Sequence, residues 1–528
     1  MVQQVHRVKL LDTTLRDGTQ MSGISFSVED KIKIAKAIDE LGVHYIEGGW
    51  PGSNIKDNQF FKEIRKIKLK NSEIVAFGST RHKNNKPQED RNLLAIVNTK
   101  VKTSCIFGKS WDLHVIHALG CSLDENLKMI DESIRFLREK GLKVIYDAEH
   151  FFDGFKAKKE YALKTIETAK KAGAFNITLC DTNGGTLPDE LREIIHQAKN
   201  AIGFDAPDVS LGIHTHNDSD CAVANSIIAV DEGCTLIHGT INGYGERCGN
   251  ANLCSVIPDL QLKSGINCIS QSKMSYLTEL SRYVSEIANI APSNHQPYVG
   301  YSAFAHKGGV HVSAMARNAH TYEHVDPKVV GNERRVLISE LSGRSNVELK
   351  VKELRLDFVK DKDSMSKIIN LIKKLEHKGY QFEDANASFL LVVRKVLGKY
   401  KPFFELKGFR VIVESDPKTN VMHSEATIKL EVNGKEEHTA SAGEGPVNAL
   451  DNALRKALEK FYPQLAEMSL GDFKVRVINA EGGTAAKVRV LIESRDKEDS
   501  WGTIGVSENI IEASWEALVD AVEFKLLK

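Results

Sequence analysis

The sequence has no excess charge of either sign and no long uncharged hydrophobic run. Its 528 residues include 71 basic and 71 acidic side chains, so no overall field attracts nucleic acid or an anionic membrane surface. No apolar stretch is long enough to span a bilayer, and residues 1–7 lack the apolar core of a secretory signal. We therefore expect a cytoplasmic protein that binds neither nucleic acid nor membrane.

Cysteine is sparse and confined to one part of the chain. The eight cysteines lie between Cys105 and Cys268, and no two of them form a CxxC pair. This spacing argues against a zinc ribbon or a dithiol redox centre and favours reduced, structural thiols. The absence of cysteine after Cys268 indicates that the chain changes character near that point.

The first half of the chain alternates short apolar runs with longer helical patterns. A chain of 528 residues with 41% hydrophobic and 27% charged residues is expected to form two or three globular domains. The alternation predicts repeated β/α units. Eight strands are predicted, at residues 8–11, 43–46, 73–77, 102–107, 143–148, 175–180, 209–214 and 235–239. Eight such units favour a TIM (β/α)8 barrel over residues 1–277.

The rest of the chain is expected to form two further parts. Residues 278–398 are helical and charged, with an amphipathic helix at 369–377, and predict linker subdomains. Residues 399–528 contain an internal repeat of a strand, a glycine and a helix: 426–432, Gly443 and 446–458, then 486–492, Gly505 and 507–524. The repeat predicts a pseudo-symmetric α+β domain that either binds a small regulatory ligand or serves dimerisation.

Polar residues follow the predicted barrel strands where they end. The active site of such a barrel lies at the carboxyl ends of its strands, whatever the chemistry. The residues found there are Arg16 and Asp17 after strand one, Glu47 after strand two, Glu149 after strand five, Asp181 and Thr182 after strand six, and His214 and His216 after strand seven. The sequence therefore predicts a polar site at one end of the barrel.

Three of these residues suit a metal ion. His214 and His216 are two residues apart on a strand, so their imidazoles point to the same face. Asp17 adds a hard oxygen ligand from strand one, which lies near strand seven in a closed barrel. Two histidines and one carboxylate leave open positions on a divalent cation for water and substrate. Read alone, the His-x-His pair is weak evidence, and Asp17 could equally cap its loop or pair with Arg16.

Three longer motifs give a specific resemblance. They are residues 11–20 (LDTTLRDGTQ), 214–218 (HTHND) and 242–250 (NGYGERCGN), in that order. Together they resemble the isopropylmalate, homocitrate and citramalate synthase family. The resemblance covers nearly the whole chain, because members of this family also carry linker subdomains and, in many cases, a terminal repeat domain that binds a feedback amino acid. It implies an acyltransferase that condenses acetyl-CoA with a 2-oxo acid, and a homodimer.

The resemblance also implies roles for particular residues. The divalent metal, Mn²⁺, Mg²⁺ or Zn²⁺, is held by Asp17, His214, His216 and Asn250. Arg16 and Thr182 bind the oxo acid, and Asp147, which faces the same way as Glu149, is expected to contact it. The residues expected to act in catalysis are Arg16, Glu149, His311 and Tyr322. His306, in the run HKGGVH at residues 306–311, competes with His311 for the role of the linker histidine.

The substrate depends on the branch of the family. Residues 46–54 (IEGGWPGSN) and 146–154 (YDAEHFFDG) look most like the branch that uses pyruvate and is inhibited by isoleucine. Phe107 and Trp111 are candidates to crowd the pocket, although ordinary packing is the better interpretation of Trp111.

Other functions remain open. The nearest alternative is a synthase that uses 2-oxoisovalerate and belongs to leucine synthesis. An alternative of another class is a metal-containing amino-acid sensor without catalysis. The sequence of the loop at residues 245–249 argues against an acyl-CoA lyase.

Overall fold

The computed structural model describes residues 8–203, 209–338, 344–353, 362–415, 417, 421–478 and 480–528. These residues fall into two compact units. The first contains the chain through Phe304 together with Val325–Glu333, and the second contains Ala305–His324 and Arg334–Lys528. Among the described residues, no helix is long and apolar enough to cross a membrane.

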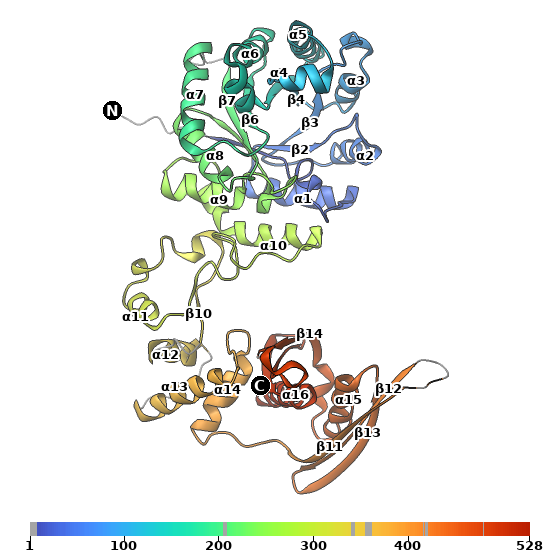
Figure 1. Ribbon diagram of the computed structural model, residues 1–528, viewed down its shortest axis with the longest axis vertical. Helices are drawn as coiled ribbons and strands as arrows, with labels where there is room; N and C mark the ends of the chain where they lie inside the picture. Colours follow the sequence, from blue (N-terminus) through green and yellow to red (C-terminus); the bar gives the residue numbers. More distant parts are fainter. Residues whose placement is uncertain are drawn as a thin grey trace. The chain divides into compact units, whose positions relative to one another are not determined.

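The first unit contains a closed parallel barrel of eight strands in sequence order (Figure 1). Its strands are β1 (Lys9–Asp12), β2 (Tyr45–Gly49), β3 (Glu73–Ser79), β4 (Thr103–Lys109), β5 (Lys143–Glu149), β6 (Asn176–Asp181), β7 (Ser210–Thr215) and β8 (Leu236–Gly239). Each matches a run predicted from the sequence to within a few residues. The predicted TIM barrel is confirmed.

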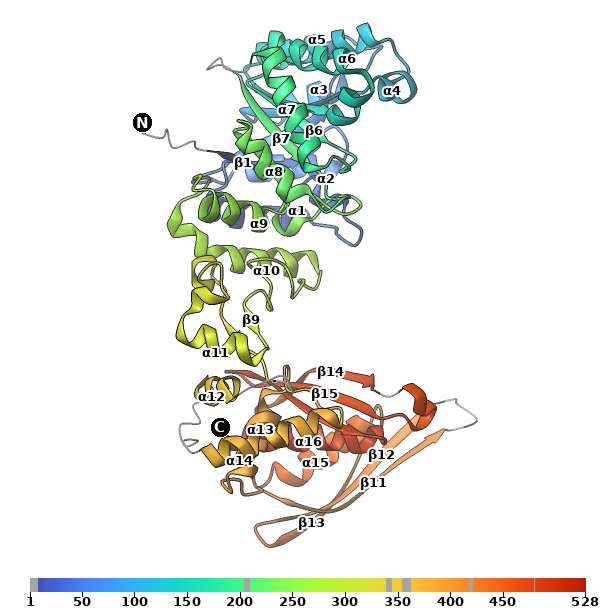
Figure 2. The same ribbon diagram turned by 60° about the vertical axis from the view of Figure 1, so that its left-hand side comes forward.

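Helices surround the barrel strands on the outside (Figure 2). They are α1 (Val28–Leu41), α2 (Ile55–Ile64), α3 (Arg91–Asn98), α4 (Asp112–His114), α5 (Leu123–Glu139), α6 (Phe151–Ala172), α7 (Pro188–Ile202), α8 (Ala222–Asp231) and α9 (Leu253–Pro258). The next helix, α10 (Leu277–Ala288), packs against α1 and α9 (Figure 2). Local sequence sets their limits. For α1, Ser27 and Asp30 form a reciprocal capping box at the start, and Gly42 adopts a left-handed conformation at the end.

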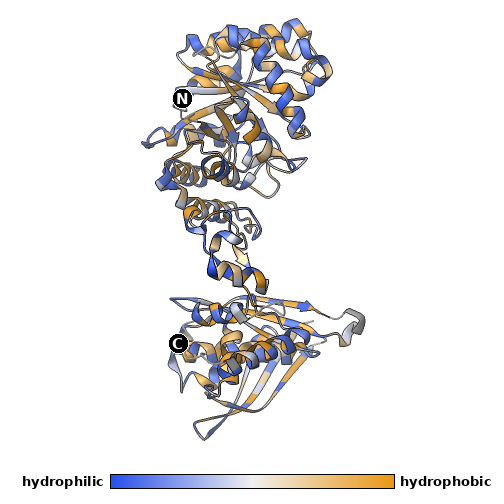
Figure 3. Cartoon of the chain, turned by 90° about the vertical axis from the view of Figure 1, so that its left-hand side faces the viewer, coloured by the Kyte–Doolittle hydropathy of each residue, from blue (hydrophilic) through white to orange (hydrophobic). Residues whose placement is uncertain are grey.

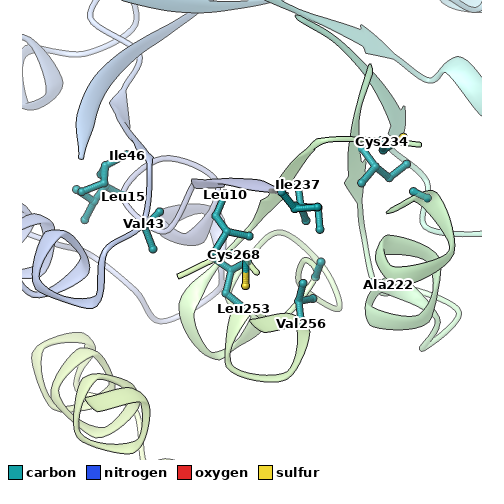
Figure 4. Close-up of a cluster of buried hydrophobic side chains, with 14 of the residues drawn as sticks. Leu10, Leu15, Val43, Ile46, Ala222, Cys234, Ile237, Leu253, Val256 and Cys268 are labelled. Atoms are coloured by element: carbon teal, nitrogen blue, oxygen red, sulfur yellow. The ribbon is translucent and has the colours of Figure 1, made fainter. Parts of the chain in front are cut away.

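The main core of the first unit lies between the strands and the helices. Leu10 of β1 pairs in register with Ile237 of β8, and both are fully buried. Figure 4 shows these two side chains packed over Leu253 and Val256, which belong to α9. Hydrophobic residues follow the barrel strands, and the outer helices carry hydrophilic residues (Figure 3). Apolar burial on the outer face therefore stabilises the barrel, and a smaller apolar cluster that includes Leu11, Val75 and Ile145 fills part of its interior.

The second unit begins with short elements and ends in a repeat. The short strands β9 (Ala305–His306) and β10 (Arg335–Val336) pair in parallel, and the helices are α11 (Gly309–Arg317), α12 (Arg344–Glu353), α13 (Lys362–His377) and α14 (Asn386–Val396). The amphipathic helix expected at 369–377 is the second half of α13. Gly379 follows it with φ +109°, a conformation that glycine adopts readily.

The terminal repeat is larger than the sequence predicts. Each half has three antiparallel strands and one helix: β11 (Glu405–Ser415), β12 (Met422–Val432), β13 (Lys435–Gly443) and α15 (Pro446–Leu458), then β14 (Ser469–Val477), β15 (Val488–Arg495), β16 (Ser500–Ser507) and α16 (Ile510–Leu527). The predicted repeat of two strand-helix units is confirmed, and the predicted strand is the central one of each three-stranded sheet. Central strands alternate buried and exposed residues most regularly, as in β12.

Both halves bury their apolar residues in one core. Ile428 and Leu430 of β12 share it with Val490 and Ile492 of β15 and with Leu518 of α16. The glycines that marked the repeat lie in the third strand of each half. A side chain at Gly443 would meet the backbone of Ala449 at 2.4 Å, and one at Gly505 would meet the carbonyl oxygen of Ala513 at 2.0 Å. Glycine therefore lets each helix approach its sheet.

We predict that Gly505→Ala destabilises the terminal domain by about 1–3 kcal/mol, because its Cβ has no space below α16. Gly445→Ala is the matched control, since its Cβ meets no atom within 4 Å and its φ is −160°. Calorimetric unfolding of the full chain measures both variants. Equal unfolding temperatures for the two would contradict the packing described here.

Candidate active site

The loop after β1 is fixed by hydrogen bonds within the barrel. The backbone N–H and the hydroxyl of Thr14 both donate to the carboxylate of Asp12, at 2.9 Å. The backbone N–H of Ile241, in the loop after β8, donates to Thr14 Oγ1 at 2.9 Å. Burial raises the pKa of Asp12 to about 7, against the hydrogen bonds from Thr14. These contacts set the position of the next residues, Arg16 and Asp17.

Arg16 is held from three sides. Its Nε donates to Glu47 Oε2 at 2.6 Å, and its Nη1 lies 3.3 Å from Asp17 Oδ2. The guanidinium also lies 3.9 Å from the centre of the Phe77 ring. Glu47, in the middle of β2, is fully buried, and its burial raises its pKa while the charge of Arg16 opposes that rise. Glu47 thus orients Arg16, a role that the sequence analysis did not assign to it.

Asp17, His214 and His216 form one buried cluster. The Nε2 atoms of the two histidines lie 3.2 Å apart, and Asp17 Oδ2 lies 3.4 Å from His214 Nε2 and 3.8 Å from His216 Nε2. All the potential ligand atoms lie within 4.8 Å of one another. A cation bound to nitrogen and oxygen at about 2.0–2.2 Å separates neighbouring ligand atoms by roughly 3.0–3.5 Å, which resembles these distances.

The protonation states also suit a cation. Burial, followed by the charge of His214, lowers the pKa of His216 to about 3, so its ring is neutral and has a free lone pair. Burial opposes ionisation of Asp17, but Arg16 and the two histidines outweigh it and hold the pKa of Asp17 below its usual range. Asp17 Oδ1 is buried and has no hydrogen-bond partner among the described residues. The cluster could therefore hold a divalent metal ion.

Asn250 joins this cluster from the loop after β8. Its Nδ2 lies 3.1 Å from Asp17 Oδ2 and 3.3 Å from His214 Nε2. The loop pairs with the end of β7 through Asn217 N and Gly249 O at 2.8 Å. A Cβ at Gly245 would lie 1.7 Å from Asn250 Oδ1, so only glycine leaves room for this amide. The glycines of the third motif therefore position Asn250.

A cavity of about 190 Å³ opens over the cluster. Seven of the predicted site residues line this cavity: Arg16, Asp17, Asp147, Glu149, Thr182, His214 and His216. At about 30 Å³ per water molecule it has room for about six waters, which suits a small organic acid. Burial raises the pKa of Asp147 to about 7, and the charge of His214 opposes that rise. Lys109 forms an ion pair with Glu149.

Thr182 presents its hydroxyl to the cavity. Its Oγ1 accepts a hydrogen bond from the backbone N–H of His150 at 2.8 Å, so the hydroxyl proton is left to donate elsewhere. Arg247 donates to the Thr182 carbonyl at 2.7 Å and pairs with Asp218 at 2.8 Å, joining the loops after β6, β7 and β8. Arg247 also lines the cavity and was missed, although it lies in the third motif, at residues 242–250.

Three aromatic rings form one wall of the cavity. Trp50 meets Phe77 and Phe107 edge on, with ring centroids 5.7 and 5.6 Å apart, and Phe77 stacks with Phe107 at 5.5 Å. All three line the cavity. Phe107 was predicted to crowd the pocket, whereas Trp50 and Phe77 were missed. Trp111 does not line it and stacks on His114 at 5.3 Å.

The other three predicted residues belong to the second unit. His311 and Tyr322 are exposed and stack, with ring centroids 4.1 Å apart. His306 is half-buried, and its Nε2 lies 3.2 Å from Glu323 Oε1, which also pairs with Arg334. Within this unit His311 and Tyr322 form an accessible pair, and His306 is part of a buried ion network.

Comparison with known proteins assigns a class to each part of the chain. Residues 7–284 match the family described as HMGL-like, residues 298–380 the homocitrate synthase post-HMGL domain-like family, and residues 383–526 the LeuA allosteric (dimerisation) domain. The fold and the site thus define a barrel of the HMGL-like class with a LeuA-type domain at its carboxyl end. The match to a LeuA allosteric (dimerisation) domain confirms that the terminal repeat is an allosteric domain, as predicted.

Relatives that match over nearly the whole chain show which family within this class the protein belongs to. The chain is 57% identical to the (R)-citramalate synthase of Geobacter sulfurreducens, covering 99% of this chain and 98% of that protein. It is 53% identical to the (R)-citramalate synthase of Aquifex aeolicus, over 99% and 98%. A 2-isopropylmalate synthase of Methanocaldococcus jannaschii is 32% identical, over 99% and 95%. The chain belongs to the (R)-citramalate synthase family.

We predict that the protein binds one divalent cation per chain and that Asp17→Asn lowers the affinity by at least about tenfold, since it removes the anionic ligand. Titration with Mn²⁺ or Zn²⁺, followed by metal analysis after dialysis, measures the loss. His196→Ala, an exposed histidine of α7 outside the cluster, is the control and is expected to bind normally. Equal metal content in Asp17→Asn and the control would refute the assignment.

Proposed function

We propose that this protein condenses acetyl-CoA with pyruvate and water, releasing (R)-citramalate and CoA. The observation that carries the proposal is the small polar cavity over the Asp17, His214 and His216 cluster, walled by Trp50 and Phe107. Identity of 44–57% to several (R)-citramalate synthases supports pyruvate over 2-oxoisovalerate. Two matching proteins, a probable 2-isopropylmalate synthase and a 2-isopropylmalate synthase, are 30% and 32% identical.

The cavity residues divide the chemistry between them. Arg16, oriented by Glu47, faces the oxygen of the oxo acid, where charge develops as the carbon-carbon bond forms. The free hydroxyl proton of Thr182 donates to the carboxylate of the oxo acid. Asp147, which lies in β5 two residues before Glu149 and also lines the cavity, contacts the substrate. Together these groups fix the orientation of the carbonyl carbon before reaction.

The metal and the proton transfer involve further residues. A divalent cation held by Asp17, His214 and His216, with Asn250 beside it, supplies Lewis-acid polarisation of the oxo acid. Glu149 is the proposed acid or base of the barrel for the proton of the acetyl methyl group. His311 and Tyr322, which stack on each other in the second unit, are the further residues proposed to act in catalysis. His306 remains the second candidate for the linker histidine, although its contact with Glu323 favours a structural role.

The remaining domains regulate and assemble the enzyme. We propose residues 1–277 as the catalytic barrel, 278–398 as linker subdomains and 399–528 as the regulatory and dimerisation domain of a homodimer. The match to a LeuA allosteric (dimerisation) domain supports both roles of the last part. Isoleucine is the proposed feedback ligand, because it is the amino acid to which the pyruvate route leads in the branch that this sequence resembles.

A thiol-release assay tests the substrate and the effector together. With acetyl-CoA and each of pyruvate, 2-oxoisovalerate and 2-oxoglutarate, pyruvate is expected to give the highest kcat/KM, and isoleucine but not leucine to inhibit. Higher activity with 2-oxoisovalerate would overturn the substrate assignment. No CoA release with any oxo acid, despite bound metal, would favour an amino-acid sensor, and no effect of isoleucine would overturn the effector.

The aromatic wall generates a second prediction. Phe107→Ala is expected to raise kcat/KM for 2-oxoisovalerate relative to pyruvate by about tenfold or more, because the truncated wall admits the extra methyl groups. Trp111→Phe is the control, since Trp111 lies outside the cavity lining. Steady-state kinetics with both acids measures the ratio. A ratio in Phe107→Ala equal to that of the control would show that the wall does not set specificity.

A further inference from the structure

Trp50 is the ring of the aromatic wall that a loop carries. Phe77 and Phe107 belong to the strands β3 and β4, whereas Trp50 directly follows β2. The indole meets both phenyl rings edge on, at centroid distances of 5.7 and 5.6 Å. Because the strands fix the phenyl rings, the shape of this wall depends on what holds the indole of Trp50.

A buried ion pair outside the catalytic cavity holds the backbone of Trp50. The N–H of Trp50 donates to Asp57 Oδ2 at 2.8 Å, and Asp57 pairs with Lys31 of α1. Both charged side chains are buried, and neither lines the cavity. Gly49 adopts φ +137°, and a Cβ there would lie 2.4 Å from Asp57 Cγ, so glycine lets this carboxylate approach the loop. Rotation of the side chain is therefore the main freedom left to Trp50.

The amide of Asn92 removes that freedom. Trp50 Nε1 donates to Asn92 Oδ1 at 2.6 Å, and Asn92 Nδ2 donates to the carbonyl oxygen of Ser79 at 2.6 Å. An indole N–H can only donate and a carbonyl oxygen can only accept, so a single orientation of the amide satisfies both partners. Asn92 therefore links the indole to the carboxyl end of β3.

The surroundings of Asn92 leave space for this contact. Its backbone N–H donates to Asp90 Oδ1 at 3.1 Å, at the start of α3. A Cβ at Gly78 would lie 2.8 Å from Asn92 Oδ1, and one at Gly52 would lie 3.3 Å from Asn92 Cα. Glycine at both positions therefore makes room for the amide between the loop after β2 and the end of β3. Asn92 itself does not line the catalytic cavity.

We infer that Asn92 is a positioning residue for the choice of oxo acid. By holding the indole of Trp50 edge on to Phe77 and Phe107, it keeps the cavity at a size that admits pyruvate and excludes the branched 2-oxoisovalerate. Without this hydrogen bond the indole can turn about its side-chain torsions, and the wall no longer keeps one shape. The identity of the two acids rests on the proposed function, whereas the hold on the indole does not.

Steady-state kinetics of Asn92→Ala measures this effect. The ratio of kcat/KM for 2-oxoisovalerate to that for pyruvate is expected to rise at least about threefold, because the loosened wall discriminates less between the two acids. Both acids are assayed at one saturating concentration of acetyl-CoA, so a change in its binding cancels in the ratio. Asn98→Ala is the control, since Asn98 is an exposed asparagine at the end of the same helix. A ratio in Asn92→Ala no higher than in Asn98→Ala would overturn the inference.

A double-mutant cycle shows whether Asn92 acts through the indole. Trp50→Phe removes the N–H group whose hydrogen bond Asn92 accepts. In the Trp50→Phe background, Asn92→Ala is expected to leave the ratio unchanged, since the contact that it breaks is already absent. A rise equal to that in the unmutated background would place the effect of Asn92 elsewhere and contradict the inference.

Near-ultraviolet circular dichroism follows the indole without turnover. Asn92→Ala is expected to weaken the tryptophan bands relative to Asn98→Ala, because a ring without fixed packing gives a weaker signal. Identical bands in the two variants would disprove the hold on the indole. If the protein turns over neither oxo acid, the proposed function fails, and weaker bands in Asn92→Ala still support the role of Asn92 in positioning Trp50.

Discussion

The site depends on the closure of the barrel between β1 and β8. Lys9–Asp12 pairs in register with Leu236–Gly239, and the loop after β1 is tied to the loop after β8 through Thr14 and Ile241. This pairing brings Asp17 within 4 Å of two histidines more than 190 residues later in the chain. Apolar burial stabilises the closed barrel between its strands and helices and also within its interior, where Leu11, Val75 and Ile145 belong to one buried cluster.

Inside the barrel, charge is balanced group by group. Arg16 lies between Glu47 and Asp17, Glu149 pairs with Lys109, and both histidines face Asp17. Burying any of these ions alone would cost several kcal/mol, so each is retained beside a partner. The groups left open among the described residues include Asp17 Oδ1, Asn250 Oδ1 and the Thr182 hydroxyl proton. They lie in or beside one small cavity, which is what a preorganised site for an anionic oxo acid requires.

The sequence predicted the barrel well because its signal is local. Apolar strands, helical periods and polar residues at strand ends are each visible within about ten residues, and all eight strands were found. The same approach found Asp17, His214 and Thr182 but missed Trp50, Phe77 and Arg247. These three line the cavity through contacts across strands or loops that no single window of sequence contains.

The prediction of the terminal domain was incomplete for a similar reason. Its central strands were predicted, whereas the flanking strands β11, β13 and β14 contain no buried residue, so their apolar pattern is weak. Chemistry that depends on one strand end was predictable, and chemistry that depends on neighbouring loops was not.

The central claim is that a new carbon-carbon bond forms between the acetyl methyl group and pyruvate. The most direct test is ¹³C NMR of the product made from acetyl-CoA labelled at the methyl carbon. We predict that the label appears in the methylene carbon of (R)-citramalate. Label found only in free acetate, with pyruvate unchanged, would show that the site hydrolyses the thioester without condensation and would contradict the account.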